Sequence, residues 1–306
     1  MKKDLISMED LSIQEITDYL TAAVKVEAMP LNERVQFLPG RIMATLFFEP
    51  STRTRLSFES AMHQLGGSVI GFAEQSATSV SKGESFTDTI HTVENYSDIL
   101  VIRHPGEGTA RLAAKESHLP VLNAGDGSNQ HPSQTLLDLY TIQKDLGKIE
   151  GIKMAFIGDL KYSRTVHSLI RALMKLNVTD FTLVAPESLR LQKYFMSNDE
   201  PGKYQFKETD DIEEAIKNCD VLYMTRIQRE RFPDLVEYEK VKDSYVLTAS
   251  MLKEAKEHAR VLHPLPRVRE IAYDVDKTKH AGYFPQMKNG VIIRQAILLK
   301  HLGVQL

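Results

Sequence analysis

The sequence predicts an α/β protein made of two doubly wound parallel-sheet domains. Three observations support this prediction. Short apolar runs alternate with amphipathic runs, as expected for buried parallel strands covered by helices on both faces. The alternation occurs as two successive series, and 306 residues suit two domains of ordinary size.

The first series begins with an apolar run at 42–48, which predicts a buried strand. A helix over 52–65 follows, because Phe58, Ala61, Met62 and Leu65 share one face, and two glycines then end it. The remaining expected elements are strands at 68–72, 98–104 and 120–124, helices that start near Ser85 and Gly108, and a long helix after Pro132.

The second series begins with a strand at 152–159 and a helix that carries Val166, Leu169, Ile170 and Leu173 on one face. The segment 147–151 (GKIEG) is the best candidate for a linker between the two series. The remaining expected elements are strands at 181–186, 204–208, 220–225 and 260–262, and helices near 187–197, 210–217 and 290–302.

Composition excludes several classes of protein. A net charge of −3 argues against nucleic acid as the main partner, because duplex-binding surfaces are basic. No stretch approaches the ~18 consecutive apolar residues of a membrane span, and the first residues lack the apolar core of a signal peptide. The single cysteine, Cys219, excludes an intrachain disulfide and a cysteine-based metal cluster, and is expected to pack as a small hydrophobe. We therefore expect a cytoplasmic enzyme without metal or cofactor.

The strongest local signal is the segment 49–55 (EPSTRTR), which follows a strand and opens a helix. The unpaired N–H groups of a helix N-terminus suit phosphate, and Ser51, Thr52 and Thr54 add hydroxyl groups. Arg53 and Arg55 add guanidinium groups, which the helix dipole disfavours at this end. A simple helix cap explains the serine and threonines but not the arginines, so we interpret the segment as an anion site.

Two further strand ends of the first series carry donors. Arg103 ends one strand, and His131 and Gln134 open the long helix after a polar loop. Taken singly, Arg103 suits a surface position and His131 a helix cap. Taken together with Arg53, they suit a small ligand that is anionic or carries a carbonyl group. The polar segment 77–84 has the composition of an ordinary exposed loop.

The second series repeats this arrangement. The segment 159–165 (DLKYSRT) opens a helix at a strand end, and Arg226 and Gln228 lie just past another strand. Only one glycine stands where a dinucleotide fingerprint needs three, so a dinucleotide site is discounted. Arg164 and Arg226 are either surface charges or, more specifically, a second anion pocket. The second interpretation places the active site in the cleft between the two domains.

The segment 263–267 (HPLPR) follows the strand at 260–262. Its two prolines fix the backbone, and a cis Leu265–Pro266 bond is compatible with this pattern. A rigid turn alone explains the prolines. A rigid turn that directs the Pro264 and Leu265 carbonyl groups at a ligand amide explains them equally well.

These motifs resemble those of the aspartate/ornithine carbamoyltransferase family nearly from end to end. The resemblance rests on the segments FFEPSTRTRLSFESA, SVSKGES, LVIRHPGEGTARLAA, NAGDGSNQHPSQTLLDLYTI, GDLKYSRTVHSL, YMTRIQRER and VLHPLPRVREIAYDVDKT. It implies a carbamoyl-phosphate-binding domain over 1–134 and 287–306, and an aspartate-binding domain over 135–286. It implies carbamoyl phosphate and L-aspartate as substrates.

The resemblance also implies a role for each motif residue. Phosphate is expected at Ser51, Thr52, Arg53 and Thr54, with Arg103 bridging phosphate and carbonyl oxygen. His131 and Thr54 are expected to bond the carbonyl oxygen. Gln134 and the carbonyl groups of Pro264 and Leu265 are expected to hold the carbamoyl amide. Aspartate is expected at Arg164, Arg226 and Gln228.

Ser79 and Lys82 are expected, by the same resemblance, to reach into the site of a neighbouring subunit. The catalytic set implied is then Arg53, Thr54, Arg103, His131 and Lys82, with Lys82 also at aspartate. The implied assembly is a homotrimer with shared active sites, and some family members add a zinc-bearing regulatory chain. The segment 76–84 is one residue shorter than in some relatives, and the Gly-Glu pair after Lys82 supports its alignment.

Three rival functions remain at this point. An ornithine carbamoyltransferase is disfavoured because its cationic substrate needs an anionic partner, and because the family's His-Cys-Leu-Pro motif is His263-Pro264-Leu265-Pro266 here. A non-catalytic scaffold is disfavoured because every donor is present. A nicotinamide oxidoreductase lacks its glycine fingerprint. We further hypothesise that filling both pockets draws the domains together before amine attack.

Overall fold

The computed structural model describes residues 4–196, 202–229, 232 and 234–306. The chain forms two compact units: residues 1–140 with 287–306, and residues 141–286. The division falls inside helix α6 (Pro132–Leu146), a short distance before the predicted linker at 147–151. A continuous helix crosses the division. The interior of a helix lacks the glycine, proline and polar residues that are typical of a linker, so composition does not indicate a boundary there.

The first unit contains a four-stranded parallel sheet with the order β2-β1-β3-β4. The central strand β1 pairs with β2 on one side and β3 on the other, and is almost wholly buried. The edge strand β2 is half exposed. The strands are β1 (Ile42–Phe47), β2 (Ser68–Phe72), β3 (Ile99–His104) and β4 (Val121–Asp126), which confirms the predicted strands of the first series.

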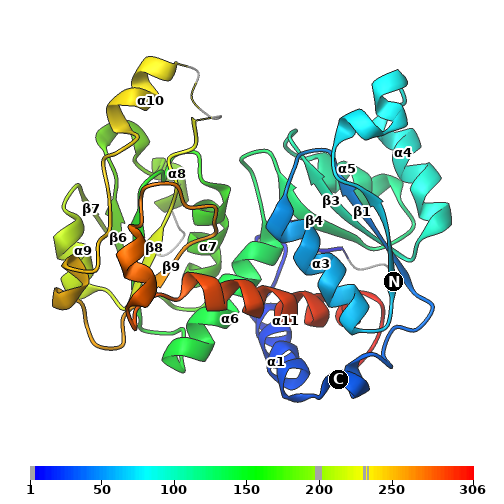
Figure 1. Ribbon diagram of the computed structural model, residues 1–306, viewed down its shortest axis with the longest axis horizontal. Coiled ribbons are helices and arrows are strands. Elements are labelled where there is room, and N and C mark those ends of the chain that lie inside the picture. The colour runs from blue at the N-terminus through cyan, green and yellow to red at the C-terminus, as the bar shows by residue number, and fades with distance from the viewer. Residues whose placement is uncertain (1–3, 197–201, 230–231, 233) are drawn as a thin grey trace. The chain divides into compact units, whose positions relative to one another are not determined.

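Helices pack around this sheet (Figure 1). Helix α3 starts at Thr52 as predicted. Helix α1 was not predicted, although Ser12 and Glu15 form a capping box at its start. The helices of the unit are α1 (Ile13–Ala28), α2 (Leu31–Arg34), α3 (Thr52–Gln64), α4 (Phe86–Val93), α5 (Thr109–Glu116), the first part of α6 and most of α11 (Tyr283–His301). Short 3-10 turns occur at η1 (Gln75–Ala77), η2 (Ser79–Lys82) and η3 (Glu94–Tyr96).

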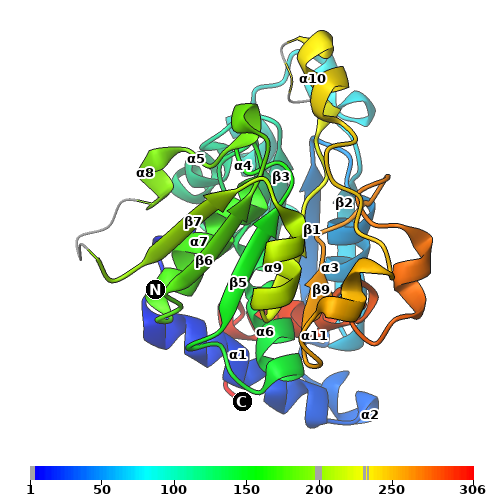
Figure 2. The same cartoon turned by 90° about the vertical axis from the view of Figure 1, so that its left-hand side faces the viewer.

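The second unit contains a five-stranded parallel sheet with the order β7-β6-β5-β8-β9. Figure 2 shows its twisted strands with helices on both faces. The strands are β5 (Lys153–Ile157), β6 (Asp180–Val184), β7 (Gln205–Thr209), β8 (Val221–Met224) and β9 (Arg260–Leu262). The helices and 3-10 turns are α7 (Arg164–Lys175), η4 (Glu187–Leu189), α8 (Lys193–Met196), α9 (Ile212–Asn218), α10 (Leu235–Val241), η6 (Met251–Glu254) and η7 (Tyr273–Lys277).

The prediction of a single helix near 187–197 is wrong, because residues 187–196 form a 3-10 turn and a separate short helix. Residue 197 lies outside the described residues. The carbonyl group of Leu189 accepts a hydrogen bond from the Leu160 N–H at 3.1 Å and is therefore not used to continue a helix. Arg190 is extended, and only Lys193–Met196 returns to a helix. The last helix begins at Tyr283, not near 290, because Pro285 in its first turn is compatible with a helix start.

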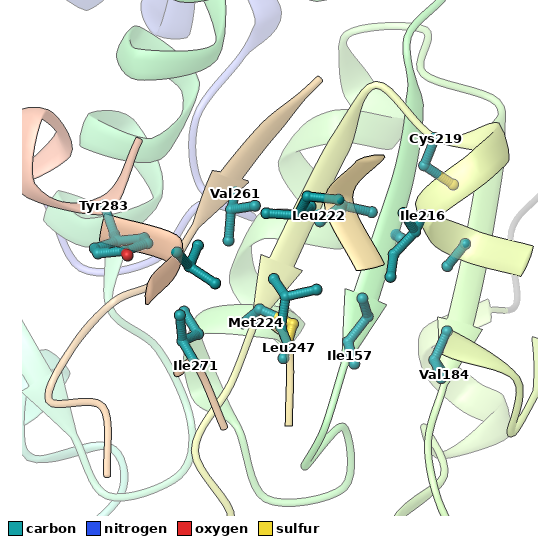
Figure 3. Packing of buried hydrophobic residues seen from close by; sticks show 14 residues of the cluster. Ile157, Val184, Ile216, Cys219, Leu222, Met224, Leu247, Val261, Ile271 and Tyr283 are labelled. Carbon is teal, nitrogen blue, oxygen red and sulfur yellow. The ribbon is translucent and has the colours of Figure 1, made fainter. Parts of the chain in front are cut away.

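The core of the second unit lies between its sheet and the helices on one face, as the close view in Figure 3 shows. Ile157, Leu222 and Val261 project into it from three neighbouring strands. Cys219 is buried in the same cluster, which confirms that it packs as a small hydrophobe, and burial raises the pKa of its thiol. In the described part of the chain, no helix is long and apolar enough to cross a membrane.

The strand orders indicate where ligands bind. In the first sheet the order reverses between β1 and β3, and in the second between β5 and β8. Doubly wound sheets bind ligands at the carboxyl ends of the strands beside such a reversal. The carboxyl ends of these four strands, with the segments that follow them, carry Glu49 to Thr54, Arg103, Asp159 to Arg164, and Arg226 with Gln228.

Candidate active site

The N-terminus of α3 follows directly from β1. Ser51 is the N-cap residue, with an extended backbone (φ −156°, ψ 104°), and no side-chain cap hydrogen bond links it to the described residues. The first turn holds no acidic residue. The capping interpretation is therefore wrong for the Ser51 hydroxyl, which stays available to a ligand at the positive end of the helix.

Arg53 and Thr54 lie in the first turn of α3, while Arg55 has a structural role. The Arg55 guanidinium pairs with Glu59 one turn further on, at 2.7 Å. This pair holds the Arg55 side chain along the helix. Thr54 is buried, and its hydroxyl lies 3.5 Å from His131 Nε2. This contact brings the ends of β1 and β4 together at one place.

Arg103 ends β3 beside this group. Its guanidinium donates to the Ala124 carbonyl oxygen at 3.5 Å and to Glu49 at 3.3 Å. Its own carbonyl oxygen accepts the Phe48 N–H at 2.9 Å, which links the segment after β1 to the end of β3. Sequence reasoning did not assign a role to Glu49, because its partner lies 54 residues away.

The loop before His131 is fixed by Asp126. This buried carboxylate accepts the backbone N–H groups of Gly108 at 2.9 Å and Gln130 at 3.1 Å, and a side-chain N–H of Asn129 at 3.0 Å. The loop therefore delivers His131 to the start of α6 in one position. A neighbouring Ser133 hydroxyl lies 3.5 Å from the other ring nitrogen of His131.

Gln134 lies three residues further along α6 and is buried. Its Nε2 donates to Asp138 Oδ1 at 2.9 Å. Asp138 was not predicted as a site residue. The available signal was a carboxylate four residues after Gln134, on a stretch of helix that is otherwise mostly apolar.

Ser79 and Lys82 form the two ends of the short turn η2, which Gly83 closes with a left-handed backbone (φ 98°). Both side chains are exposed. They lie on a surface turn of their own, on a different element from the donors at the ends of β1, β3 and β4.

In the second unit, Arg164 is the first residue of α7. The segment before it is held by Asp159, which is fully buried and accepts the Tyr162 N–H at 2.9 Å. Burial raises the pKa of Asp159 to about 6, against the opposing effect of backbone hydrogen bonds from Tyr162, Gln228 and Lys161. The same carboxylate therefore contacts the segments after β5 and after β8.

Arg226 follows β8 and lines a cavity of about 260 Å³ within the second unit. Other cationic groups of this cavity are Arg229, Lys242 and Arg269, and its acidic groups are Glu239, Asp243 and Glu270. Arg269 pairs with Asp243 at 3.1 Å. The cavity is thus a polar pocket at the carboxyl end of the second sheet. Arg226, one of the residues predicted to bind aspartate, lines this pocket. Gln228 is two residues further along the chain.

The turn at 263–267 is rigid. The Leu265–Pro266 bond is cis, and Leu265 adopts a left-handed backbone (φ 55°) that a branched residue rarely adopts. The buried His263 ring receives the Leu265 N–H at Nδ1, 2.7 Å away, and bonds Glu270 through Nε2 at 2.8 Å. Burial acts to raise the pKa of Glu270, but hydrogen bonds from the His263 side chain and from the Val268 N–H outweigh it and lower the pKa. His263 and Glu270 therefore hold the turn, a role the sequence did not reveal.

Two groups of donors thus lie at the carboxyl ends of two parallel sheets, and comparison with known proteins identifies the family and the class of enzyme. Residues 3–144 match the family model for the carbamoyl-P binding domain of aspartate/ornithine carbamoyltransferase. Residues 150–300 match the model for the Asp/Orn binding domain. The chain belongs to the aspartate/ornithine carbamoyltransferase family, and it is an enzyme of the carbamoyltransferase class.

Within this family, the chain is similar to several aspartate carbamoyltransferases. The aspartate carbamoyltransferase catalytic subunit of Thermococcus kodakarensis is 58% identical over 99% of this chain and 97% of that protein. The catalytic subunit of M. jannaschii aspartate transcarbamoylase is 50% identical, covers 98% of both chains and superposes with a TM-score of 0.91. Aspartate transcarbamoylase from Trypanosoma cruzi, solved with carbamoyl phosphate and aspartate, is 38% identical over 100% of this chain and 96% of that one, with a TM-score of 0.90.

Proposed function

We propose that this chain transfers the carbamoyl group of carbamoyl phosphate to the amino group of L-aspartate. The products are N-carbamoyl-L-aspartate and phosphate, a step of de novo pyrimidine biosynthesis. The observation that carries this proposal is the N-terminus of α3. There the Ser51 hydroxyl makes no cap hydrogen bond, and Arg53 lies next in sequence to Thr54, whose hydroxyl contacts His131. Relatives that are more than half identical and named for aspartate support the choice of acceptor.

Phosphate binds at the start of α3. Ser51, Thr52 and Thr54 supply hydroxyl groups, Arg53 supplies a guanidinium, and the first backbone N–H groups of the helix point to the same place. As the C–O bond of the acyl phosphate breaks, the departing phosphate gains negative charge on the oxygen that joined it to carbon. A site rich in fixed donors therefore stabilises the transition state more than the ground state.

The carbonyl oxygen binds to Arg103, His131 and Thr54. The contacts of Thr54 and Ser133 on either side of the imidazole hold the ring, and Asp126 fixes the loop that precedes it. The nitrogen of aspartate attacks the carbonyl carbon, which pushes negative charge onto this oxygen. The new C–N bond forms, the C–O bond to phosphate breaks, and the amine proton leaves with phosphate. The carbamoyl amide is held by Gln134 and by the carbonyl groups of Pro264 and Leu265.

Aspartate binds in the second unit, at Arg164, Arg226 and Gln228. Two arginines suit two carboxylates, since a guanidinium can bond a carboxylate through two N–H groups. Asp159 supports this group because it contacts backbone on both segments that carry it. An ornithine-specific pocket needs an anionic group for the substrate ammonium, and competition between the two acceptors tests this. Faster carbamoylation of ornithine than of aspartate contradicts the proposal.

The finer assignments are also proposals. The first unit is the carbamoyl-phosphate-binding domain, 1–134 with 287–306, and the second is the aspartate-binding domain, 135–286. The chain works in the cytoplasm as a homotrimer in which Ser79 and Lys82 complete a neighbour's site. The exposure of both side chains on η2 supports this assignment. The resemblance adds a zinc-bearing regulatory chain as a candidate partner, for which co-purification with stoichiometric zinc is the test.

Two experiments test the proposal. Purified protein is assayed for carbamoyl-aspartate formation and for phosphate release that depends on aspartate. A non-catalytic scaffold releases none. Shared sites are tested by mixing Arg53→Ala and Lys82→Ala subunits after dissociation. Recovered activity in the mixture supports sites built from two chains, and its absence contradicts them.

A further inference from the structure

We propose that Asp138 and Arg294 act as a positioning pair that fixes which end of the Gln134 amide faces the substrate. The pair thereby makes the site select a substrate that carries N–H donors on the transferred carbon. The inference rests on the proposed placement of the carbamoyl group at Gln134. It adds two residues with no assigned role, and a reason for the choice of substrate.

The first step concerns the direction of the Gln134 amide. Its side chain is 5% exposed, and it bonds Asp138, which is 0% exposed. A carboxylate has acceptors only, so the NH2 end of the amide must face Asp138. The Oε1 atom then faces the other way and presents an acceptor. A carbamoyl NH2 group matches that acceptor, whereas a methyl group offers no donor to it.

The second step concerns the charge of Asp138. An isolated buried carboxylate tends to take up a proton, after which it can donate to Gln134 and allow the amide to turn over. Arg294 on α11 opposes this, because its guanidinium carries the opposite charge and attracts the carboxylate. Arg294 is 3% exposed. Burial lowers the pKa of Arg294 to about 10, while attraction to Asp138 acts to raise it.

The third step concerns how Arg294 is held. Its Nη1 donates to the Gly290 carbonyl oxygen at 3.1 Å, and its guanidinium carbon lies 5.0 Å from the centre of the Phe58 ring. A side-chain carbon at Gly290 would lie 2.6 Å from Nη1, so glycine is needed for this approach. Phe58 belongs to α3, the helix that also carries Arg53. The pair thus packs against both α3 and α6, which carry the proposed carbamoyl phosphate site.

The test compares two substrates that share the phosphate. Carbamoyl phosphate carries NH2 on the transferred carbon, and acetyl phosphate carries CH3. With aspartate as acceptor, the two kcat/KM values give a selectivity ratio. We expect Asp138→Asn to lower this ratio by about 10–100-fold, the loss of one hydrogen bond, because the introduced amide can turn its own NH2 toward Gln134. The fall is expected in the carbamoyl reaction, with acetyl transfer changing by less than about 3-fold.

Arg294→Met extends the test to the second member of the pair. Loss of the guanidinium removes an attraction that favours the charged form of Asp138, so the ratio is expected to fall in the same direction. A single charge left in the core is destabilising, so either variant could fail to fold. The double variant Asp138→Leu/Arg294→Met leaves no lone charge and carries the test in that case, with the same expected fall. An unchanged ratio in folded variants overturns the proposal.

Tyr140→Phe provides a matched control on the same helix. It removes the partly buried hydrogen bond from the Tyr140 hydroxyl to Glu27, 2.8 Å long, without altering Gln134. We expect lower stability and an unchanged selectivity ratio. A ratio that falls equally in this control shows that general loosening of α6 is responsible and overturns the positioning role. Absence of carbamoyl-aspartate formation by the wild-type protein instead contradicts the proposed function, which keeps the two failures distinct.

Discussion

Asp159→Asn is expected to change how stability depends on pH. Asp159 is fully buried at the end of β5, and its Oδ2 atom has no hydrogen-bond partner among the described residues. Burial therefore penalises the charged form and raises the pKa of this carboxyl group from 3.8 to about 6. The folded protein binds the proton more tightly than the unfolded chain does. Asn has nearly the same shape and does not titrate in this range.

The size of the effect follows from the shift in pKa. A rise from 3.8 to about 6 corresponds to about 3 kcal/mol, at about 1.36 kcal/mol per pKa unit. Since the folded pKa is the higher one, this stabilisation is fully present below pH ~4 and is lost as the pH rises to about 6. The unfolding free energy of wild type minus that of Asp159→Asn should thus fall by up to about 3 kcal/mol over this interval. Above pH ~6 the difference should be constant.

Urea unfolding at half-unit steps from pH 4 to 7.5 measures this difference, because all other titrating groups cancel between the two proteins. Glu257→Gln, which alters a carboxylate that is 91% exposed, is the control and should give a flat difference. A flat or rising curve for Asp159→Asn would refute the reasoning, since it would mean that the surrounding N–H groups outweigh burial. The KM for aspartate should rise severalfold in the same variant, because a neutral amide holds the Tyr162 and Gln228 segments less firmly.

Three other changes have expected outcomes. Arg53→Ala should lower kcat by about 10²–10³-fold, whereas Arg41→Ala, which breaks an exposed pair with Asp98, should not, and near-wild-type turnover in Arg53→Ala contradicts the phosphate site. Glu270→Gln should lower the unfolding free energy by about 1–3 kcal/mol and reduce kcat, as measured by urea unfolding and steady-state assay, because His263 loses the carboxylate that accepts its Nε2 hydrogen bond and the turn at 263–267 loosens. Gly158→Ala should destabilise by about 1–3 kcal/mol and raise the KM for aspartate, since the added carbon at a backbone φ of +117° would lie 2.3 Å from the Thr225 carbonyl oxygen.

The strands could be predicted because buried parallel strands are continuous apolar runs between polar turns. Helix α10 (Leu235–Val241) was not predicted, and the reason is physical. The helix has only seven residues, which is too short for an apolar period to stand out in the sequence. The boundary between the units lies inside α6, and composition alone could not place it there, since a helix that passes from one unit to the other has ordinary helix composition.

The donors at strand ends could also be predicted, because strand ends beside a sheet reversal are where ligands bind. The carboxylates that contact these donors or hold their segments could not be predicted from the sequence, with one exception. Glu49 reaches its partner Arg103 across 54 residues, and Asp159 is aspartate at a turn, which is common in any protein. Asp138 is the exception, since its spacing of four from Gln134 was readable.

The four carboxylates share a physical role that follows from their positions. Glu49, Asp138, Asp159 and Glu270 each contact a group that is proposed to bind substrate or to hold one that does. Each adds negative charge near a site for anions, which opposes substrate binding. Their contribution is therefore to orientation. A guanidinium or amide held on one side by a carboxylate has fewer arrangements to lose when the ligand arrives, so more of its interaction energy remains for the transition state. Replacing such a carboxylate by its amide should thus lower kcat more than it raises the KM for the anionic substrate.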